Sequence, residues 1–293
     1  MSRYDLRIAD NTSMSFEIAN SVREIKDTYG DNASVISKKK SLHKFGRTTN
    51  ADAGVKTTVA VFQDAVVNET FATSNSVDRI VSSSATDTET IVVEGHYFDS
   101  SNNFVFSSQE VTLTGQTAAS LSQPLCRATR AYVKKGTFAS PATFLRGNVV
   151  VYDNALATSG LTSGKPNVDE SVKLIVQGNT TELTAKNQSE KCATALSYLD
   201  YWIITEVYAG MTRDAGATAE VDIDIEVREI GGVWRPLGLE INLRRGSLDA
   251  QHDEMNPPFI VPKNSDVRMV ATSDAADITI AGYIHGYLAL VVD

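Results

Sequence analysis

The sequence is poor in the residues from which disulfide frameworks and zinc sites are built. Its 293 residues include two cysteines and four histidines, and neither cysteine stands in a CxxC or Cys/His spacing. We therefore expect Cys126 and Cys192 to be two buried thiols, with a single disulfide between them as the alternative.

Long apolar runs are also missing. No stretch of about 18 uninterrupted apolar residues occurs, so no transmembrane helix is expected. The first residues, Met1-Ser-Arg-Tyr-Asp-Leu-Arg7, have no apolar run behind their charges, which predicts a chain without a secretory signal that is made in a cytoplasm. Hydrophobic residues nevertheless make up 42% of the composition, which is enough for a packed core, and the length suits two domains of ordinary size.

Patterns that mark active sites are missing as well. There is no GxSxG elbow, no P-loop and no HExxH or His-x-His pattern. The four histidines are far apart in the sequence, at His43, His96, His252 and His285. We therefore expect no catalysis and no cofactor.

Two acidic clusters are candidates for metal binding, but neither has the form of a site. Asp222, Asp224 and Glu226 share one face of an expected strand, where neighbouring carboxylates stand about 7 Å apart, a spacing too regular for a compact calcium cage. A solvated strand face explains them better. The sequence His252-Asp253-Glu254 lies in an expected loop, and no metal is expected there either.

The sequence does contain the alternation of half-buried β-strands. In Val221-Asp-Ile-Asp-Ile-Glu-Val-Arg228, apolar and charged residues alternate at every position, before a Gly231-Gly232 turn and a second apolar run. Because successive side chains of a strand point to opposite faces, the apolar residues from Val221 to Val227 are expected to enter a core. The charged residues between them are expected to face water.

Strands of this kind recur through most of the chain, separated by turn signals, and this favours a sandwich or barrel. A polar hairpin turn is expected between Phe98 and Phe104, and prolines frame a strand edge at residues 256–262. The expected strands are residues 55–62, 78–82, 90–95, 109–115, 127–133, 144–152, 198–208, 221–228, 233–243, 266–271 and 278–292.

Charge divides the chain unevenly. Residues 1–50 contain nine Lys and Arg against six Asp and Glu, whereas the remaining residues contain 18 against 30. A mildly basic arm on an acidic body is indicated, and no binding of nucleic acid is expected outside the arm. At residues 153–165 the composition shifts to Ala, Thr, Ser and Gly. We expect an arm of residues 1–50, a first β-domain of residues 51–160 and a second β-domain of residues 161–293.

The arm is expected to be an amphipathic helix followed by a basic run. Asn11-Thr-Ser supplies an N-cap, and Gly30 ends the helical pattern. The apolar residues recur at three- and four-residue spacing, at Met14, Ile18, Val22, Ile25 and Tyr29. The basic residues that follow are Lys38, Lys39, Lys40, Lys44 and Arg47. This arm either docks on a neighbouring subunit, with its basic run on an acidic surface or packaged nucleic acid, or folds back on its own β-body with a solvated charge run.

Large aromatic residues such as Trp202, Tyr208 and Trp234 leave two non-enzymatic functions open. Interfaces between subunits favour Tyr, Trp and Arg, and a host-surface binding module would use exposed aromatics to stack on sugars. Each of these aromatic residues could instead simply pack in the core. The arm favours assembly, because a free sugar-binding module has little use for a helix and a basic extension.

Four segments within residues 79–133 carry a resemblance to a known family. They are Arg79-Ile-Val-Ser-Ser-Ser-Ala-Thr-Asp-Thr88, Thr90-Ile-Val-Val-Glu-Gly-His-Tyr-Phe-Asp99, Glu110-Val-Thr-Leu-Thr-Gly-Gln-Thr117 and Arg127-Ala-Thr-Arg-Ala-Tyr-Val133. This part resembles a module of virion structural proteins of tailed bacteriophages, marine phages and cyanophages in particular. The segments at 226–236 and 257–268 are similar to companion regions of the same proteins. The sequence departs from the module at Asp87-Thr-Glu-Thr90, where a glycine-rich turn is usual.

The resemblance, which covers roughly three quarters of the chain, implies a mainly β structural component of the virion, assembled in the host cytoplasm. Its fold is expected to be two antiparallel domains of β-sandwich or jelly-roll type, preceded by the N-terminal helical arm. The expected function is that of a head decoration or cement protein that binds the major capsid protein and stabilises the capsid, as a homotrimer. The alternative is a tail or head appendage that binds host surface glycans.

Overall fold

The structure of the protein is a computed structural model in which strands account for every element described. It describes residues 36–51, 53–61, 71–134, 144–155, 160–168, 171–179, 187–213, 219–245, 249–276 and 278–291. The expectation of a mainly β protein with antiparallel sheets is confirmed within these ranges. They contain no helix with the length and apolar character needed to cross a membrane. The predicted helix at residues 11–30 lies outside the described residues.

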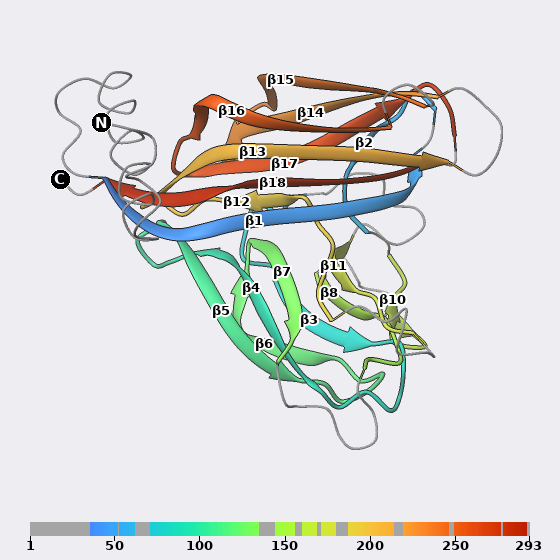
Figure 1. Cartoon of the computed structure of the whole chain (residues 1–293). Helices are drawn as coiled ribbons and strands as arrows, with labels where there is room; N and C mark the ends of the chain where they lie inside the picture. Colours follow the sequence, from blue (N-terminus) through green and yellow to red (C-terminus); the bar gives the residue numbers. More distant parts are fainter. Residues whose placement is uncertain are drawn as a thin grey trace, which may run out of the picture.

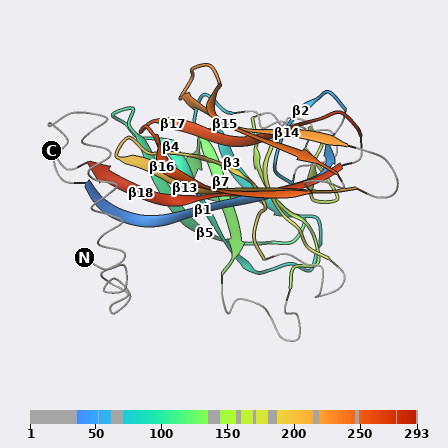
Figure 2. The same cartoon turned by 45° about the horizontal axis from the view of Figure 1, so that its top comes forward.

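A first sandwich is built from two sheets that use both ends of the described chain. Its β1 and β18 run antiparallel side by side over their length, so the first described strand lies next to the last (Figures 1 and 2). One sheet has the order β1 (Ile36–Ala51), β18 (Ile278–Val291), β13 (Asp200–Arg213) and β16 (Ala250–Val261). The other has the order β12 (Ala193–Ala195), β17 (Ser265–Ser273), β14 (Glu220–Glu229) and β15 (Arg235–Arg244), with β2 (Lys56–Thr58) also paired to β17.

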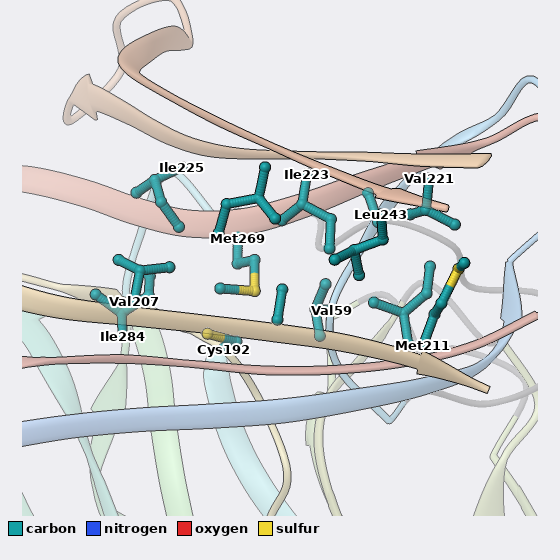
Figure 3. Packing of buried hydrophobic residues seen from close by; sticks show 14 of the residues in the cluster. Val59, Cys192, Val207, Met211, Val221, Ile223, Ile225, Leu243, Met269 and Ile284 are labelled. Atoms are coloured by element: carbon teal, nitrogen blue, oxygen red, sulfur yellow. The ribbon is translucent and has the colours of Figure 1, made fainter. Parts of the chain in front are cut away.

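The core of this sandwich is filled by alternate residues of both sheets (Figure 3). Val221, Ile223 and Ile225 of β14 are buried there, as their alternation predicts, opposite Val207 and Ile284 of the facing sheet. Each fully buried aliphatic side chain of this size contributes about 1.5 to 3 kcal/mol relative to an exposed one. The predicted turn around Gly231-Gly232 is also found, between β14 and β15.

A second sandwich lies beside the first and encloses a separate core (Figure 1). One sheet has the order β11 (Val172–Val176), β8 (Val149–Asp153), β3 (Val77–Ser82) and β6 (Ala119–Leu125). The other has the order β5 (Phe104–Thr112), β4 (Thr90–Phe98) and β7 (Arg127–Val133). A small ribbon pairs β9 (Leu161–Thr162) with β10 (Lys165–Pro166). The predicted hairpin turn between Phe98 and Phe104 joins β4 to β5.

The strands of the second sandwich follow β2 and precede β12, both of which belong to the first. The predicted division into residues 1–50, 51–160 and 161–293 stays a prediction, although sheet pairing crosses two of its bounds. Residues 36–50 are part of a sandwich strand, and β11, beyond residue 160, pairs with β8 before it. The reason is that antiparallel pairing joins strands far apart in sequence, which local composition does not register.

Buried ion pairs connect the two sandwiches. Arg127 on β7 donates two hydrogen bonds to Asp266 on β17, at 2.7 and 3.0 Å, and both residues are almost fully buried. Arg228 adds a third bond to the same carboxylate at 3.1 Å. The ring of Phe71 contacts both guanidinium groups, whose central carbons lie 4.9 Å (Arg127) and 4.5 Å (Arg228) from the ring centre. In this junction the charged groups have hydrogen-bond partners, and the partners come from both sandwiches.

One acidic residue of β14 departs from the expectation of a solvated face. Asp222 is exposed, but Glu226 on the same face is buried, bound by Arg268 at 2.8 Å and by Lys56 at 2.7 Å. Neighbouring strands β17 and β2 cover this end of the face with cations, so a charged residue is buried there with partners. The expected loop at His252-Asp253-Glu254 is also wrong, because these residues belong to strand β16.

Candidate partner-binding surface

The predicted basic run is a strand of the first sandwich and not an extension. Lys38, Lys39, Lys40, Lys44 and Arg47 all belong to β1, which pairs with β18. Among those whose side chains are described, Lys40 is exposed, Arg47 is half-buried and Lys44 is buried. The helical residues Met14, Ile18, Val22, Ile25 and Tyr29 lie outside the described residues.

Lys44 is buried between the two sandwiches. Its Nζ donates a hydrogen bond of 3.0 Å to the carbonyl oxygen of Thr129 on β7. Burial lowers the pKa of the amine to about 7, although the carboxylate of Glu94 opposes this by favouring the charged form. Lys44 therefore connects the sandwiches and is not available as a surface charge.

Arg47 is also engaged inside the molecule. Its Nε lies 3.3 Å from a carboxylate oxygen of Glu190, and its Nη2 donates a hydrogen bond of 3.2 Å to the side chain of Gln177. Lys44 and Arg47 thus contact groups of their own chain, whereas the side chains of Lys38 and Lys39 lie outside the described ones and their part in a partner contact stays a prediction.

A groove follows the free edge of β1. A cavity of about 330 Å³ is lined by residues 40–45, six consecutive positions of the strand, and by Glu94, Thr129 and Arg130 of the second sandwich. Consecutive strand residues face opposite ways, so a cavity that touches all six must border the edge of the strand and not one of its faces. Because β1 ends its sheet, this edge has no neighbouring strand in the described part of the chain.

A second cavity of about 330 Å³ continues the groove and is more apolar. It shares Lys40, Leu42 and Lys44 with the first, and Phe106, which is 44% exposed, also lines it. His96 in its wall is buried and stacks on Phe104 with ring centres 5.0 Å apart. Burial lowers the pKa of His96 to about 3, with smaller contributions from the nearby cations, so this histidine is neutral at ordinary pH.

The outer face of the sheet with β1 carries two rows of side chains that run across its four strands. Register pairing places one row at His43, His285, Glu206 and Glu254, on β1, β18, β13 and β16 in that order. The next row contains Phe45, Tyr283, Tyr208 and His252. Directly opposed residues of antiparallel strands have their side chains on one face, about 5 Å apart. Three of the four histidines of the chain thus gather on this face.

Contacts within and between the rows are close. The Nδ1 atoms of His43 and His285 are 3.3 Å apart, and the ring of Tyr283 lies 4.9 Å from that of His43. Tyr208 and Tyr283 stack with ring centres 5.4 Å apart. His252 Nε2 lies 3.8 Å from the carboxylate of Glu206. The result is a half-exposed surface of aromatic, imidazole and acidic groups, of which the aromatic groups are the kind enriched at protein interfaces.

The aromatic residues predicted as contacts fall in three different places. Trp202 is fully buried in the core, and Trp234 is half-buried with its ring 4.4 and 4.2 Å below the guanidinium groups of Arg228 and Arg268. Only Tyr208 lies on the outer face. Phe45 and Tyr283 are not predictable from the sequence as contact residues, because their proximity to Tyr208 depends on the register between distant strands.

Neither a disulfide nor a metal-binding cluster is found among the described residues. Cys126 and Cys192 are free and buried, as predicted, and burial raises the pKa of both. No three His, Cys, Asp or Glu side chains in the described ranges are arranged to hold a metal ion.

Comparison with known proteins does not assign this chain to a family. No protein-family model matches the sequence, and no curated protein sequence matches it significantly. Among solved structures, the chain is similar at 8% identity and a TM-score of 0.22 to a chain of the T13 IBDV viral particle, over 96% of this chain and 77% of that one. The VP2 subviral particle of infectious bursal disease virus gives 11% identity, the same TM-score and coverage of 94% and 77%. Likeness at this level establishes neither a common fold nor a common function.

Proposed function

We propose that this protein is a structural component of a virus particle that works by binding other virion proteins. Within that class we propose a head decoration protein of a tailed bacteriophage, bound to the major capsid protein as a trimer and without catalysis. The sequence resemblance at residues 79–133, 226–236 and 257–268 supports the class, and the location that follows is the assembled virion.

The observation that carries the proposal is the outer face of the sheet with β1. It presents Phe45, Tyr283 and Tyr208 as a row of half-exposed aromatics on strands that are fixed by a packed core. Aromatic groups on a rigid sheet bury much surface at a low cost in side-chain entropy, which suits a permanent contact. The edge of β1, which has no neighbouring strand among the described residues, borders the same face and suits the addition of a partner strand.

The test is sedimentation of the purified full chain with capsids that lack it. We expect saturation at a fixed ratio, and mass analysis of the protein alone should give a discrete oligomer. The double variant Phe45→Ala with Tyr283→Ala should lose binding, since a contact at the centre of an interface contributes about 2 kcal/mol or more. Val233→Ala is the matched control, because Val233 is 78% exposed on the β14 to β15 turn, away from the two rows.

Full binding by the double variant would remove the outer face from the proposal. Failure of the unmodified protein to bind capsids would overturn the decoration function itself.

A host-adhesion function remains the second candidate, on one specific observation. The stacked pair Tyr208 and Tyr283 stands beside Glu206, and an aromatic platform next to a carboxylate is suited to sugar rings and their hydroxyls. Retention of the protein on host cells, with loss of retention in Tyr283→Ala and no binding to capsids, would favour this function over decoration.

A further inference from the structure

A buried histidine at the junction of the two sandwiches has no hydrogen-bond partner for its side chain. His96 on β4 is only 5% exposed, and its Nδ1 is fully enclosed without a partner. Its Nε2 makes no hydrogen bond with the described residues either. A neutral imidazole offers one donor and one acceptor, and buried polar groups of native proteins are nearly always paired. This imidazole is therefore available to a molecule that binds beside it.

His96 stands in the wall of the more apolar of the two cavities of the groove. This cavity of about 330 Å³ is lined by residues of both sandwiches, among them Leu42 of β1 and Phe106 of β5. On β4, His96 and Glu94 share the face opposite to Val93, which belongs to the core of the second sandwich, so both side chains turn toward the cavity. The unpartnered imidazole thus borders a space large enough for a small molecule.

Two aromatic rings hold the imidazole in place. It stacks on Phe104 with ring centres 5.0 Å apart and an angle of 11° between the rings. Phe106, the residue opposite His96 in the register of β4 with β5, stands edge-on to it at 5.5 Å. The orientation of the ring is therefore fixed before anything binds, which lowers the entropic cost of a hydrogen bond to it.

The surroundings select the chemical class of the ligand. Burial lowers the pKa of His96 to about 3, with smaller contributions from Lys44 and Arg127, so the imidazole is neutral. Burial also lowers the pKa of Lys44, in the same wall, to about 7, which shows that this place disfavours charge. A hydroxyl group suits either tautomer of a neutral imidazole, because it both donates and accepts a hydrogen bond. The exposed ring of Phe106 favours an aromatic body.

We propose that the cavity beside His96 binds a small uncharged molecule with an aromatic ring and a hydroxyl group, the hydroxyl at the imidazole and the ring against Phe106 and Leu42. Because Nδ1 is enclosed, the nitrogen that meets the hydroxyl is Nε2. This site does not depend on the proposed function, since it lies at the junction of the sandwiches and not on the outer face.

The experiment is a titration of phenol into the full chain, followed by the nuclear magnetic resonance signals of nitrogen-15-labelled histidine rings. Toluene, which has a methyl group in place of the hydroxyl, is the comparison. We expect one phenol per chain, bound at least about tenfold more tightly than toluene, because an analogue without the hydroxyl leaves the buried imidazole unpaired. The ring-nitrogen signals of His96 should shift as phenol saturates, and those of the exposed His252 should not.

Three variants locate the site. His96→Phe keeps an aromatic ring on Phe104 but removes both nitrogens, so it should bind phenol no more tightly than toluene. His252→Ala on the outer face is the matched control and should bind both compounds as the original protein does. Phe106→Ala removes a wall of the cavity at a position that is 44% exposed, and it should weaken both compounds. This variant and the His96 signals of the original protein test the site even where His96→Phe does not fold.

The inference is overturned if phenol shows no saturable binding, which would mean that water alone meets the imidazole, or if toluene binds as tightly as phenol. A preference for phenol that survives in His96→Phe, or that is lost in His252→Ala, would place the hydroxyl elsewhere on the protein. Each of these results contradicts the assignment to His96.

Discussion

At the scale of single residues, alternation along a strand predicts which face a side chain occupies but not what covers that face. Asp222 and Glu226 obey the same period on β14, yet one is exposed and the other buried between Lys56 and Arg268. On β1, Lys40 is likewise exposed, whereas Lys44 is buried and bonded to the carbonyl of Thr129. The sequence indicates the direction of each side chain, and the neighbouring strands, which it does not reveal, decide whether a charge meets water or a partner.

The substitution Asp266→Ala should be strongly destabilising. Asp266 is fully buried and accepts hydrogen bonds from Arg127 and Arg228, and removing it leaves the Arg127 guanidinium buried without a counter-charge. We expect a loss of about 3 to 5 kcal/mol in the free energy of unfolding. Urea denaturation measures this, with the exposed Asp222→Ala as the control, expected within about 0.5 kcal/mol of the original protein. Equal effects of the two substitutions would contradict the buried ion pair.

Lys44→Met should change how stability depends on pH. The pKa of Lys44 falls from 10.5 to about 7 on folding, so between these values the unfolded chain binds a proton that the folded protein has lost. Stability of the original protein must therefore rise with pH through this window, by at most about 1.4 kcal/mol per pH unit from this group. Below pH 7 both states are protonated and the penalty of the buried charge is constant.

The measurement is the difference in unfolding free energy between the original protein and Lys44→Met, taken by urea denaturation on both sides of pH 7 and toward pH 10. The absolute difference also contains the lost hydrogen bond to Thr129, which does not change with pH. The slope alone tests the buried amine, and two parallel profiles would mean that Lys44 is charged and solvated in the folded protein.

At the scale of elements, β1 shows why the sequence of a basic strand predicts an extended arm. Its lysines dominate the composition, and the alternation beneath them, with Leu42, Lys44 and Gly46 turned inward, contains few apolar residues. Lysine on an edge strand is also what a β-protein uses to prevent uncontrolled pairing of its edges. A run of positive charge is therefore as typical of an edge strand as of a docking extension.

Truncation at two points distinguishes the strand from the arm. Removal of residues 1–50 takes away β1, its ladder with β18 and the hydrogen bond from Lys44 to the second sandwich, so we expect a protein that is aggregated or unfolded. Removal of residues 1–35 retains all of these contacts and should retain a cooperative unfolding transition. Circular dichroism and size-exclusion chromatography report both results, and a well-folded product lacking residues 1–50 would show that β1 is dispensable for the body.

At the scale of the whole molecule, the sequence indicates two β-units but not how the chain divides between them. Most predicted strands exist because alternation within a strand is local information. The pairing of β1 with β18 and of β2 with β17 joins residues more than 200 positions apart, and no local pattern records it. For the same reason the sequence predicted Tyr208 as a contact residue but not the two rows in which it lies.

Polar contacts across the junction predict that the two sandwiches unfold together. Arg127 and Asp266 form a buried pair between them, and Lys44 and Lys191 of the first donate hydrogen bonds to carbonyls of β7 in the second. Separating the sandwiches would expose these groups without partners, at a cost of about 1 to 3 kcal/mol for each unpaired group. A state with one sandwich folded and the other unfolded is thereby disfavoured.

The two tryptophans make this expectation measurable, because Trp202 and Trp234 both belong to the first sandwich. Tryptophan fluorescence then follows the first sandwich and, through the contact of Trp234 with Phe71, the junction, whereas far-ultraviolet circular dichroism follows the strands of both sandwiches. We expect the two signals to give the same urea midpoint and the same slope in the original protein. In Asp266→Ala the signals should separate if the junction is what couples the sandwiches. Two separate midpoints in the original protein would mean that each sandwich is stable without the other and that the buried ion pairs align them without making their folding cooperative.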